Sequence, residues 1–318
     1  MSTDPQDAIK QFLFLMGTVD EQMKATFQNM HHGYPTETLV RFLKARDWNV
    51  QKAHKMLIDC LQWRIQNEID NILAKPIIPT NMYRAVRDSQ LVGLSGYSKE
   101  VNYYVQSHVQ MNEYRDCVLL PTATKKYGRH ISTCLKVLDM TGLKLSALNQ
   151  IKILTTISTI DDLNYPEKTE TYYIVNAPYI FSACWKAVKP LLQERTKRKI
   201  QVLQGSGKDE LLKIMDYSSL PHFCRKEGSG SARRGSNVTT DNCFSLDHAY
   251  HQQLYSYIKQ KATLKETGSP VKEGSVHVEF PQPDPDDTKI AQTIESKFHK
   301  LADHNGLCNS INDLKFGH

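Results

Sequence analysis

Between residues 132 and 215 the chain alternates short apolar runs with longer helical segments, and this alternation constrains the fold more than any other feature. Residues 132–138 and 171–175 are β-branched and apolar, which predicts buried strands, and residues 145–160 between them have the spacing of a long helix. A third strand and a further helix follow within residues 186–215. Strand, helix and strand in this order predict a parallel crossover. The expected fold is therefore α/β, with helices covering a mainly parallel sheet.

A helical region and a low-complexity tail flank the α/β segment. Residues 20–71 place apolar side chains at helical spacing, which predicts several helices packed on one another. After Cys224 the composition turns to Gly, Ser and Arg, which is typical of a flexible linker, and only weak helical segments follow, so we expect most of this tail to be mobile. The predicted organisation has three parts: a helical module over residues 1–75, the α/β domain over residues 76–226, and a flexible linker and weakly helical tail over residues 227–318.

Composition limits the compartment and the partners. The chain of 318 residues has a formal net charge of +6 and seven cysteines, none of them in a Cys-x-x-Cys pair. Single, scattered cysteines indicate a reducing compartment. The sequence shows neither a secretory signal nor an apolar stretch of roughly 20 residues, so we expect a cytoplasmic protein that meets membranes only peripherally. The modest positive charge favours acidic surfaces such as anionic lipid headgroups.

One motif resembles an enzyme site. Gly205-Ser206-Gly207-Lys208 is similar to a phosphate-binding loop, but such a loop needs Gly at the place of Val202 and Ser or Thr at the place of Asp209. No nucleophile-elbow motif occurs. The histidines lack the spacing of metal ligands: His31, His32, His130 and His222. We therefore expect neither catalytic activity nor a bound metal, and the lack of zinc spacing or an aromatic RNA-binding motif argues against nucleic acid as a partner.

A specific order of motifs points to a family. Tyr165-Pro166-Glu167 precedes an aromatic-rich strand that ends in Asn176-Ala177-Pro178, and a Pro-containing helix and a basic run that ends at Lys199 follow. A helical pattern lies upstream over residues 38–53. Together these segments resemble the CRAL-TRIO phosphatidylinositol/phosphatidylcholine transfer proteins of the plant and fungal cytosolic-factor type. The resemblance covers roughly residues 38–224 and implies a CRAL-TRIO lipid-binding domain behind an N-terminal helical module.

The resemblance implies a bound phospholipid, phosphatidylinositol above all, and no cofactor. The family's headgroup-binding positions fall on Arg46, Glu167 and Lys199 in this sequence. Cations suit the phosphate diester, and a carboxylate accepts hydrogen bonds from the inositol hydroxyls. For each residue taken alone, an ordinary surface ion pair is the alternative interpretation.

The family's gate helix corresponds to residues 183–192, where Pro190 limits regular helical hydrogen bonding. The resemblance assigns the gate's apolar side chains to Trp185, Val188, Leu191 and Leu192. An apolar helix that carries Trp enters the headgroup layer of a membrane, while neighbouring lysines meet anionic lipid. A helix buried on the sheet is the alternative, and both interpretations hold together because a closed gate covers apolar surface.

Two departures from the family pattern affect the expected ligand. The lining of the lipid cavity is expected to include Tyr114, Cys134, Lys136 and Tyr173. The family has a Ser-x-Thr pair for phosphocholine where this chain has Cys134 and Lys136, so phosphatidylcholine is not expected to bind by that route. In addition, Gly96-Tyr97 runs almost directly into a helix predicted over residues 101–119, and one strand of the family pattern is missing there. Its loss exposes backbone groups and apolar surface, which predicts weaker lipid retention.

The expected function is that of a phosphatidylinositol-binding transfer or presentation protein. It acts between the cytosol and membrane surfaces in phosphoinositide signalling or vesicle traffic. The resemblance further implies a monomer, peripheral association with Golgi or other endomembranes, and a lipid kinase or trafficking protein as a partner. A regulatory or scaffold protein of the same family, with an impaired lipid site, is the alternative.

Overall fold

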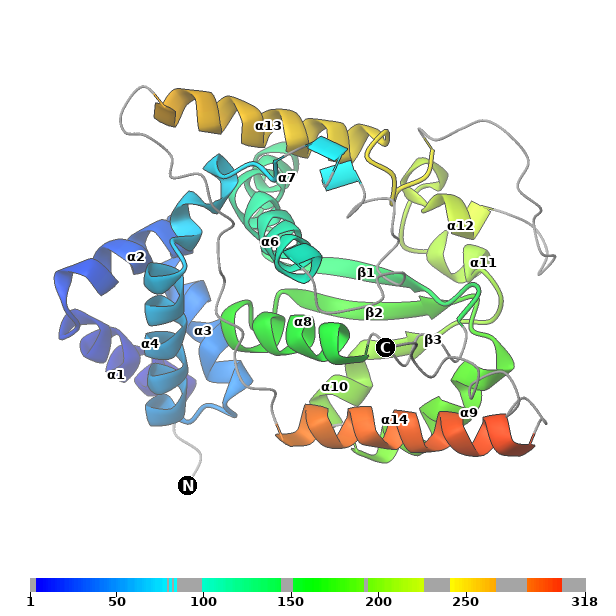
Figure 1. Cartoon of the computed structure of the whole chain (residues 1–318). Coiled ribbons are helices and arrows are strands. Elements are labelled where there is room, and N and C mark those ends of the chain that lie inside the picture. The colour runs from blue at the N-terminus through cyan, green and yellow to red at the C-terminus, as the bar shows by residue number, and fades with distance from the viewer. Residues whose placement is uncertain are drawn as a thin grey trace, which may run out of the picture. The chain divides into compact units, whose positions relative to one another are not determined.

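Figure 1 shows the computed structural model of the chain. The structure describes residues 4–78, 80–81, 83–84, 99–143, 151–191, 194–225, 241–266 and 285–304. The chain divides into two compact units that are interleaved along the sequence. The first unit takes in Met1–Thr133, Ile157–Lys168 and Phe244–Pro281, and the second takes in Cys134–Thr156, Thr169–Cys243 and Gln282–His318. The compact units group the residues differently from the three sequential parts expected above, and those parts stay predictions.

Four helices begin the first unit, and side-chain caps fix where three of them start. They are α1 (Pro5–Gly17), α2 (Glu21–His31), α3 (Pro35–Ala45) and α4 (Val50–Gln66). Asp4, Asp20 and Asn49 each accept a hydrogen bond from a backbone N–H of the first turn, at 2.8, 2.8 and 3.0 Å. Such caps satisfy N–H groups that have no partner inside the helix. The predicted N-terminal helical module is thereby confirmed.

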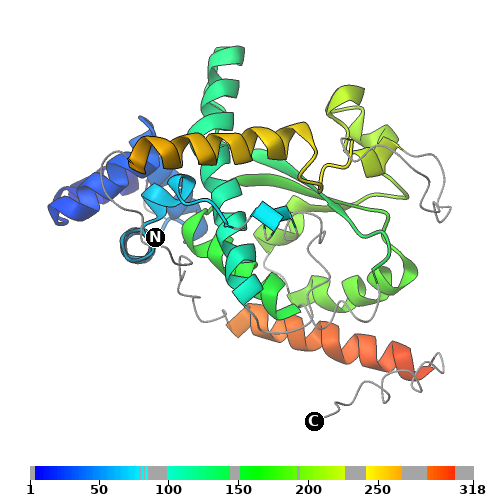
Figure 2. The ribbon, with the colours of Figure 1, turned by 45° about the horizontal axis from the view of Figure 1, so that its top comes forward.

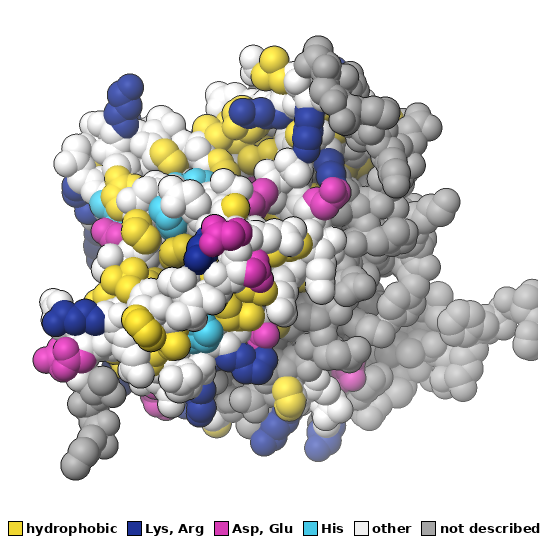
Figure 3. Space-filling model, turned by 90° about the vertical axis from the view of Figure 1, so that its left-hand side faces the viewer, with side chains coloured by type: hydrophobic (Ala, Val, Ile, Leu, Met, Phe, Trp, Pro, Cys, Tyr) yellow, Lys and Arg dark blue, Asp and Glu magenta, His cyan; other side chains and the backbone are white. Residues whose placement is uncertain are grey.

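These four helices share one hydrophobic core. Phe12, Leu39, Phe42 and Leu57 are large members of this core and are almost fully buried. Leu39, Phe42 and Leu57 lie on the apolar stripes that the helical spacing predicted, whereas Phe12 lies on α1, upstream of that pattern. Figure 3 looks onto the outer side of these helices, where basic and acidic side chains are interspersed with hydrophobic ones. The part of this face that the structure describes therefore presents no continuous basic surface.

A long helical run with one wide turn follows in the first unit. After the 3-10 helix η1 (Ile69–Ala74), α6 (Lys99–Tyr114) continues through a π-helical turn, η2 (Arg115–Leu119), into α7 (Leu120–Tyr127). The helix predicted over residues 101–119 is confirmed, and it extends to Tyr127. A π-turn holds one more residue than an α-helical turn. It therefore changes the direction in which the neighbouring side chains point from the helix axis.

The helix α13 (Ala249–Glu266) packs into the first unit. Leu254 and Ile258 are buried in one cluster with Tyr114 of α6. Figures 1 and 2 both show α13 crossing the helical run of α6 and α7. A helix was predicted at this place, but its buried apolar face differs from the mobile tail that composition led us to expect. The few apolar residues that make this contact stand in a polar stretch of sequence, so the composition did not indicate the contact.

The second unit contains a parallel sheet. Its described strands are β1 (Cys134–Asp139), β2 (Thr169–Val175) and β3 (Ile200–Val202), in that order across the sheet. The connection from β1 to β2 contains α8 (Ile151–Asn164), and the connection from β2 to β3 contains α9 (Tyr179–Val188), the 3-10 helix η4 (Lys189–Leu191) and α10 (Glu194–Lys199). Both strand pairs are parallel. The predicted α/β class with parallel crossovers is confirmed.

Short helices and one long C-terminal helix complete the second unit. They are α11 (Lys208–Leu211), η5 (Tyr217–Ser219), α12 (His222–Arg225) and α14 (Pro285–His304). α14 packs against α9, as Figure 1 shows. Among the helices that the structure describes, none is long and apolar enough to cross a bilayer.

The expected loss of one strand stays a prediction. The described part of the sheet has three strands. Residues 85–98, which contain Gly96-Tyr97, lie outside the described residues. Because α6 begins at Lys99, the described chain is helical directly after the predicted gap.

Asn176 links the carboxyl ends of β1 and β2. Its φ is 52°, in the left-handed region, and its side-chain nitrogen donates a hydrogen bond to Asp139 Oδ1 at 2.8 Å. Its backbone N–H donates to the carbonyl oxygen of Gly205 at 2.6 Å. Asn adopts left-handed conformations more readily than most residues, and its amide can satisfy a neighbouring carboxylate. The Asn-Ala-Pro motif therefore has a structural role at this edge of the sheet.

Gly207 occupies a position with no room for a side chain. Its φ is +65°, and an added Cβ would lie 2.7 Å from Leu203 Cδ1 and 2.9 Å from Val175 Cγ1. The Gly-Ser-Gly-Lys run is thus a closely packed turn into α11. This packing accounts for the glycine without a bound phosphate.

We predict that Gly207→Ala lowers the free energy of unfolding by about 2 kcal/mol or more, because a left-handed backbone penalty of about 1–2 kcal/mol adds to a steric clash. Gly205→Ala is the matched control, since its φ of +56° brings the same kind of penalty with nothing within 4 Å of the added Cβ. Urea denaturation of both variants measures the difference. Equal losses in the two variants would contradict the importance of the close contact.

Candidate functional site

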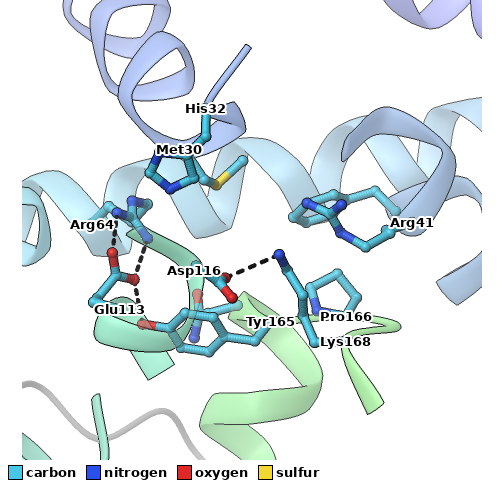
Figure 4. Close-up of a pocket in the computed structure, with 11 residues that line it drawn as sticks. Met30, His32, Arg41, Arg64, Glu113, Asp116, Tyr165, Pro166 and Lys168 are labelled. Atoms are coloured by element: carbon cyan, nitrogen blue, oxygen red, sulfur yellow. Dashed lines mark hydrogen bonds and ion pairs between the residues drawn. The ribbon is translucent and has the colours of Figure 1, made fainter. Parts of the chain in front are cut away.

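A small pocket lies inside the first unit (Figure 4). Its lining comes from α2, α3, α4, the end of α6 with the π-turn, and the Tyr-Pro-Glu segment: Met30, His32, Arg41, Phe42, Arg64, Glu113, Asp116, Asn164, Tyr165, Pro166 and Lys168. Its volume is about 340 Å³ with the solvent at its mouth included. Without that solvent, the space open to a water-sized molecule is only about 20 Å³, so the pocket suits a small polar group rather than two acyl chains.

A buried ion pair with a tyrosine forms one wall of the pocket. Arg64 Nη1 donates to Glu113 Oε1 at 2.8 Å, and Arg64 Nη2 donates to Glu113 Oε2 at 3.0 Å. The Tyr165 hydroxyl donates to the same carboxylate at 2.7 Å, and Asp70 accepts from Arg64 at 2.7 Å. Two-point pairing of this kind fixes the guanidinium plane. The network therefore joins α4, α6 and the Tyr-Pro-Glu segment through polar contacts in the interior of the unit.

Electrostatics hold these groups in one protonation state. Burial works against the charge on Arg64, but the charge and hydrogen bonds of Glu113 outweigh it and raise the pKa of Arg64 well above its usual value. Burial raises the pKa of Tyr165 well above the usual value, and the negative charge of Glu113 raises it further. Arg64 is thus charged and Tyr165 neutral at pH 7. The tyrosine remains a hydrogen-bond donor.

The π-turn η2 carries Asp116, whose carboxylate lines the pocket beside Lys168. Its carboxylate accepts from Arg115 Nε at 2.7 Å and pairs with Lys168 Nζ at 3.1 Å. Burial raises the pKa of Asp116, but the charges of Lys168 and Arg115 outweigh burial and lower it overall. Burial also lowers the pKa of Lys168, against the attraction of Asp116. Asp116 is therefore ionised at neutral pH and shares its charge between two cations.

Arg41 is the cation of the pocket with the fewest polar contacts. Its guanidinium donates to Thr38 Oγ1 at 3.0 Å, and within the described residues it makes no ion pair. Burial lowers the pKa of Arg41, and Asp116 counteracts this only in part. Figure 4 shows Arg41 and Lys168 pointing into the same space. Arg41 and Lys168 therefore line the same side of the pocket.

His32 and Cys117 form the nearest approach to a nucleophilic pair. Cys117 Sγ lies 3.8 Å from His32 Nε2. Burial raises the pKa of the Cys117 thiol to about 12, and burial lowers the pKa of His32. Both groups are therefore neutral at pH 7, and the thiolate that a nucleophile requires is not formed. In the described part of the chain no cluster of three or more His, Cys, Asp or Glu is arranged to hold a metal ion.

The three headgroup residues expected from the resemblance fall in different units. Arg46 is the C-cap of α3, where its guanidinium donates to the carbonyl of Ala45 at 2.9 Å. Glu167 follows the pocket residue Pro166 and has a φ of 58°. Both lie in the first unit, whereas Lys199 ends α10 in the second. Their convergence on one ligand therefore stays a prediction.

The gate residues are described only in part. Trp185 lies on α9 and stacks on Phe181, with the ring centroids 6.1 Å apart. Pro190 lies in η4, directly after α9 ends, as its missing N–H predicted. Leu192 and the side chains of Val188 and Leu191 lie outside the described part of the chain. The gating role stays a prediction.

The residues expected to line a lipid cavity are split. Tyr114 packs against α13 in the first unit. In the sheet, Lys136 pairs in register with Tyr172 and has its ammonium 5.6 Å from that ring, and Cys134 precedes Lys136 by two residues next to a register irregularity. Tyr173 alternates to the other face from Tyr172. Lys136 and Tyr173 therefore lie on opposite faces of the sheet.

Sequence analysis missed most of the charged pocket residues. Arg41, Arg64 and Lys168 stood within or beside recognised motifs without being assigned to a site, and Glu113 and Asp116 carried no motif of their own. Glu113 and Arg64 are 49 residues apart in the sequence. No local pattern announces a pairing over that distance, and the π-turn that directs Asp116 inward has no known sequence signal. A signal was available in the sequence: some charged residues stand at positions that the amphipathic pattern assigns to the buried face of a helix.

Comparison with known domains assigns the chain to a family. The model of the CRAL/TRIO N-terminal domain matches residues 6–59, and the model of the CRAL/TRIO domain matches residues 99–224. The chain belongs to the CRAL/TRIO family. The family resemblance inferred from the motifs is thereby confirmed, and the two matches together cover more than half of the chain.

Curated relatives and a solved structure agree with this assignment. The phosphatidylinositol/phosphatidylcholine transfer protein SFH9 of Arabidopsis thaliana is 28% identical over 221 residues, which cover 60% of this chain and 38% of SFH9. The SEC14 cytosolic factor of Eremothecium gossypii is 27% identical over 209 residues, which cover 58% of this chain and 67% of that protein. The chain thus spans about two fifths to two thirds of the length of these relatives.

The crystal structure of Sfh5 shares the fold of this chain. The TM-score is 0.52 at 18% sequence identity, and the match covers 81% of this chain and 98% of Sfh5. At this level of identity the likeness concerns the fold alone. It agrees with a CRAL/TRIO domain behind a helical N-terminal module.

We predict that Asp116→Asn lowers the free energy of unfolding at pH 7 by about 3–5 kcal/mol, because it leaves two buried cations without their shared anion. The folded pKa of Asp116 lies below the unfolded value of about 3.9, so its contribution is fully present above that value and disappears as the pH falls through the folded pKa. The difference between the wild type and the variant should therefore shrink below about pH 4.

Denaturation at several pH values tests this prediction. Asp59→Asn is the control, since Asp59 forms an exposed pair with Lys55 at 2.7 Å and should contribute less than about 1 kcal/mol. A loss for Asp116→Asn that is as small as that of the control would contradict the role of the buried carboxylate.

Proposed function

We propose that this chain binds phosphatidylinositol and transfers it between membranes, or presents it at a membrane surface, from the cytoplasm. The observation that carries the proposal is the presence of both CRAL/TRIO domains together with Arg46, Glu167 and Lys199 at the family's headgroup positions. The names of the relatives support it, since SFH9 is a phosphatidylinositol/phosphatidylcholine transfer protein. The proposed protein is a carrier with a phospholipid as its ligand and no cofactor.

Each proposed headgroup residue has suitable chemistry. Arg46 and Lys199 supply donors for the phosphate diester, and Glu167 supplies an acceptor for inositol hydroxyls. The left-handed φ of Glu167 supports a functional role, because a residue other than Gly keeps such a conformation only where the surroundings impose it. Lys136, with its ammonium over Tyr172, places a positive charge where a choline group would be repelled. This supports phosphatidylinositol over phosphatidylcholine.

The proposed route for lipid exchange is the movement of α9. Tyr179 at its start is 84% exposed, and the Phe181–Trp185 stack gives the helix an aromatic side. Aromatic rings of this kind favour the headgroup layer of a membrane. Such a protein would act peripherally at Golgi or other endomembranes, as a monomer, in phosphoinositide signalling or vesicle traffic with a lipid kinase or trafficking protein as partner.

We predict that Lys199→Ala reduces the rate of phosphatidylinositol transfer between vesicles by about tenfold or more, since a hydrogen bond to a charged group contributes roughly 1.5–3 kcal/mol. The thermal transition should change little, because Lys199 is only partly buried at the C-terminal end of α10. Arg198→Ala is the matched control, as Arg198 is the exposed neighbour on the same helix. Equal transfer by wild type and Lys199→Ala would refute the headgroup assignment.

The scaffold alternative makes a different prediction for the wild type. A regulatory protein with an impaired lipid site would be monodisperse but empty in native mass spectrometry. Phosphatidylinositol retained through purification would argue against it. If the purified protein is empty and Lys199→Ala binds its partner as tightly as the wild type does, the scaffold alternative is favoured.

α14 adds a prediction about the gate. Because α14 packs against α9, α9 must separate from it or carry it along when it moves. Burial raises the pKa of Cys184 on α9 to about 11, and the ammonium of Lys297 on α14 is close enough to oppose that shift. We expect a chain that ends at residue 284 to exchange phosphatidylinositol several-fold faster than the full chain. A chain that ends at residue 304 keeps α14 and is the control, and equal rates for both truncations would rule out a restraint by α14.

A further inference from the structure

The C-terminal end of α7 carries cations that have no acidic partner. Lys125 and Lys126 lie in the last turn of α7, Arg129 follows just after the helix, and all three residues are exposed. Within the described residues none of the three makes an ion pair. The sequence contains neither Asp nor Glu over residues 117–138. We call residues 125–130, in the first unit, the α7 tip.

The neighbouring elements do not neutralise the α7 tip. His130 of the tip stacks on Tyr34 directly before α3, with the ring centroids 3.7 Å apart. The first turn of α3 carries one carboxylate, Glu37, whose charge acts on Arg41. Asp116, on the π-turn before α7, already pairs with two other cations. Even if Glu37 is assigned to the tip, three cations stand against one carboxylate.

Local contacts hold the α7 tip in one conformation. Gly128 ends α7 with a left-handed φ of 63°, which glycine adopts without strain. The Thr124 hydroxyl accepts a hydrogen bond from the backbone N–H of Ile131 at 3.0 Å, and this contact ties the turn back to α7. The stack of His130 on Tyr34 fixes the other side. The cations are therefore displayed on an ordered turn.

The α7 tip extends past the helix that covers α6. The helical run meets α13 through Met111, Tyr114 and Val118, and all three residues precede α7. Figure 2 shows α7 continuing beyond its crossing with α13. At the tip Tyr127 is 62% exposed, and the ammonium of Lys126 lies 5.2 Å from the centre of its ring. The tip thus presents an aromatic ring among cations.

The helix dipole explains only part of this arrangement. Cations in the last turn of a helix are stabilised by the partial negative charge of its free carbonyl groups, which accounts for Lys125 and Lys126. It accounts neither for Arg129, which lies beyond the helix, nor for the exposed ring of Tyr127. An anionic surface outside the chain would suit all four side chains.

We propose that the α7 tip docks on a membrane surface that contains anionic lipid. Each cation near such a surface raises binding by about fivefold, and an aromatic ring with a polar end favours the headgroup layer. A specific protein interface buries roughly 800 Å² on each partner, whereas the tip is one helical turn and a short loop, so a membrane suits it better than an acidic protein does.

The docking surface goes beyond the function proposed above. None of its residues is a proposed headgroup or gate residue, and it lies in the first unit, whereas α9 and Lys199 lie in the second. It does not require a lipid to be bound inside the protein. The scaffold alternative would therefore also dock in this way.

The test is co-sedimentation of the purified chain with vesicles of phosphatidylcholine and phosphatidylserine. We expect the double variant Lys125→Glu with Lys126→Glu to bind about 25-fold or more weakly than the wild type, from two lost attractions of about fivefold each. The double variant Lys52→Glu with Lys55→Glu is the matched control, because it changes the net charge equally at two exposed lysines of α4. Equal losses in the two double variants would overturn the proposal.

A second measurement uses the wild type alone and does not depend on the folding of a variant. Acetic anhydride acetylates accessible lysines, and mass spectrometry gives the extent at each one. Phosphatidylserine vesicles should reduce acetylation of Lys125 and Lys126 severalfold, and should leave Lys52 and Lys55 as they are with phosphatidylcholine vesicles. Added salt should reverse the protection, because mobile ions screen exposed charges. Unprotected lysines at the tip of a chain that sediments with the vesicles would overturn the proposal.

Two further outcomes separate this surface from the other interpretations. If the vesicles protect the exposed Lys186 and Lys189 beside the gate and leave the α7 tip accessible, the membrane contact lies at α9, and the proposal fails while the proposed function stands. If the wild type ignores phosphatidylserine vesicles but binds polyglutamate, and Lys125→Glu with Lys126→Glu abolishes that binding, the tip is a surface for an acidic protein and the membrane assignment is overturned.

Discussion

The buried network of Arg64, Glu113 and Tyr165 is the interaction on which the first unit depends. It ties α4 to α6 and to the Tyr-Pro-Glu segment, and each of its polar atoms would be costly to bury alone. Charged groups in a protein interior tolerate little misplacement, because their mutual attraction offsets desolvation only in good geometry. The network therefore sets the distance between the N-terminal helices and the helices that follow, and with it the width of the pocket.

The sequence predicted the fold wherever a local pattern decides it. β-branched runs located β1 and β2, and helical spacing located α2, α3 and α4, whereas α1 lies upstream of the pattern that was recognised. The π-turn at Arg115 was not foreseen, since it arises from packing that accommodates one additional residue rather than from a residue preference. The packing of α13 was equally hidden, because Leu254 and Ile258 stand in a polar segment and find their partners only in the folded unit.

For the site, motif matching and geometry supplied different information. The resemblance named Arg46, Glu167 and Lys199, positions that no charge pattern would have singled out. The pocket brought in Arg41, Lys168 and Asp116, which come together only in the folded arrangement. Alternation along a strand also places two residues of the expected cavity lining, Lys136 and Tyr173, on opposite faces of the sheet.

The first unit draws on three stretches of chain that lie far apart in the sequence. Because a ribosome releases the N-terminal end first, the early helices have time to collapse on their own core, but α13 emerges only after the whole sheet has been made. Until then the apolar surface around Tyr114 has no cover. During synthesis the N-terminal part of the first unit therefore stays without α13 for a long interval. We expect a chaperone to bind the nascent protein at this uncovered surface.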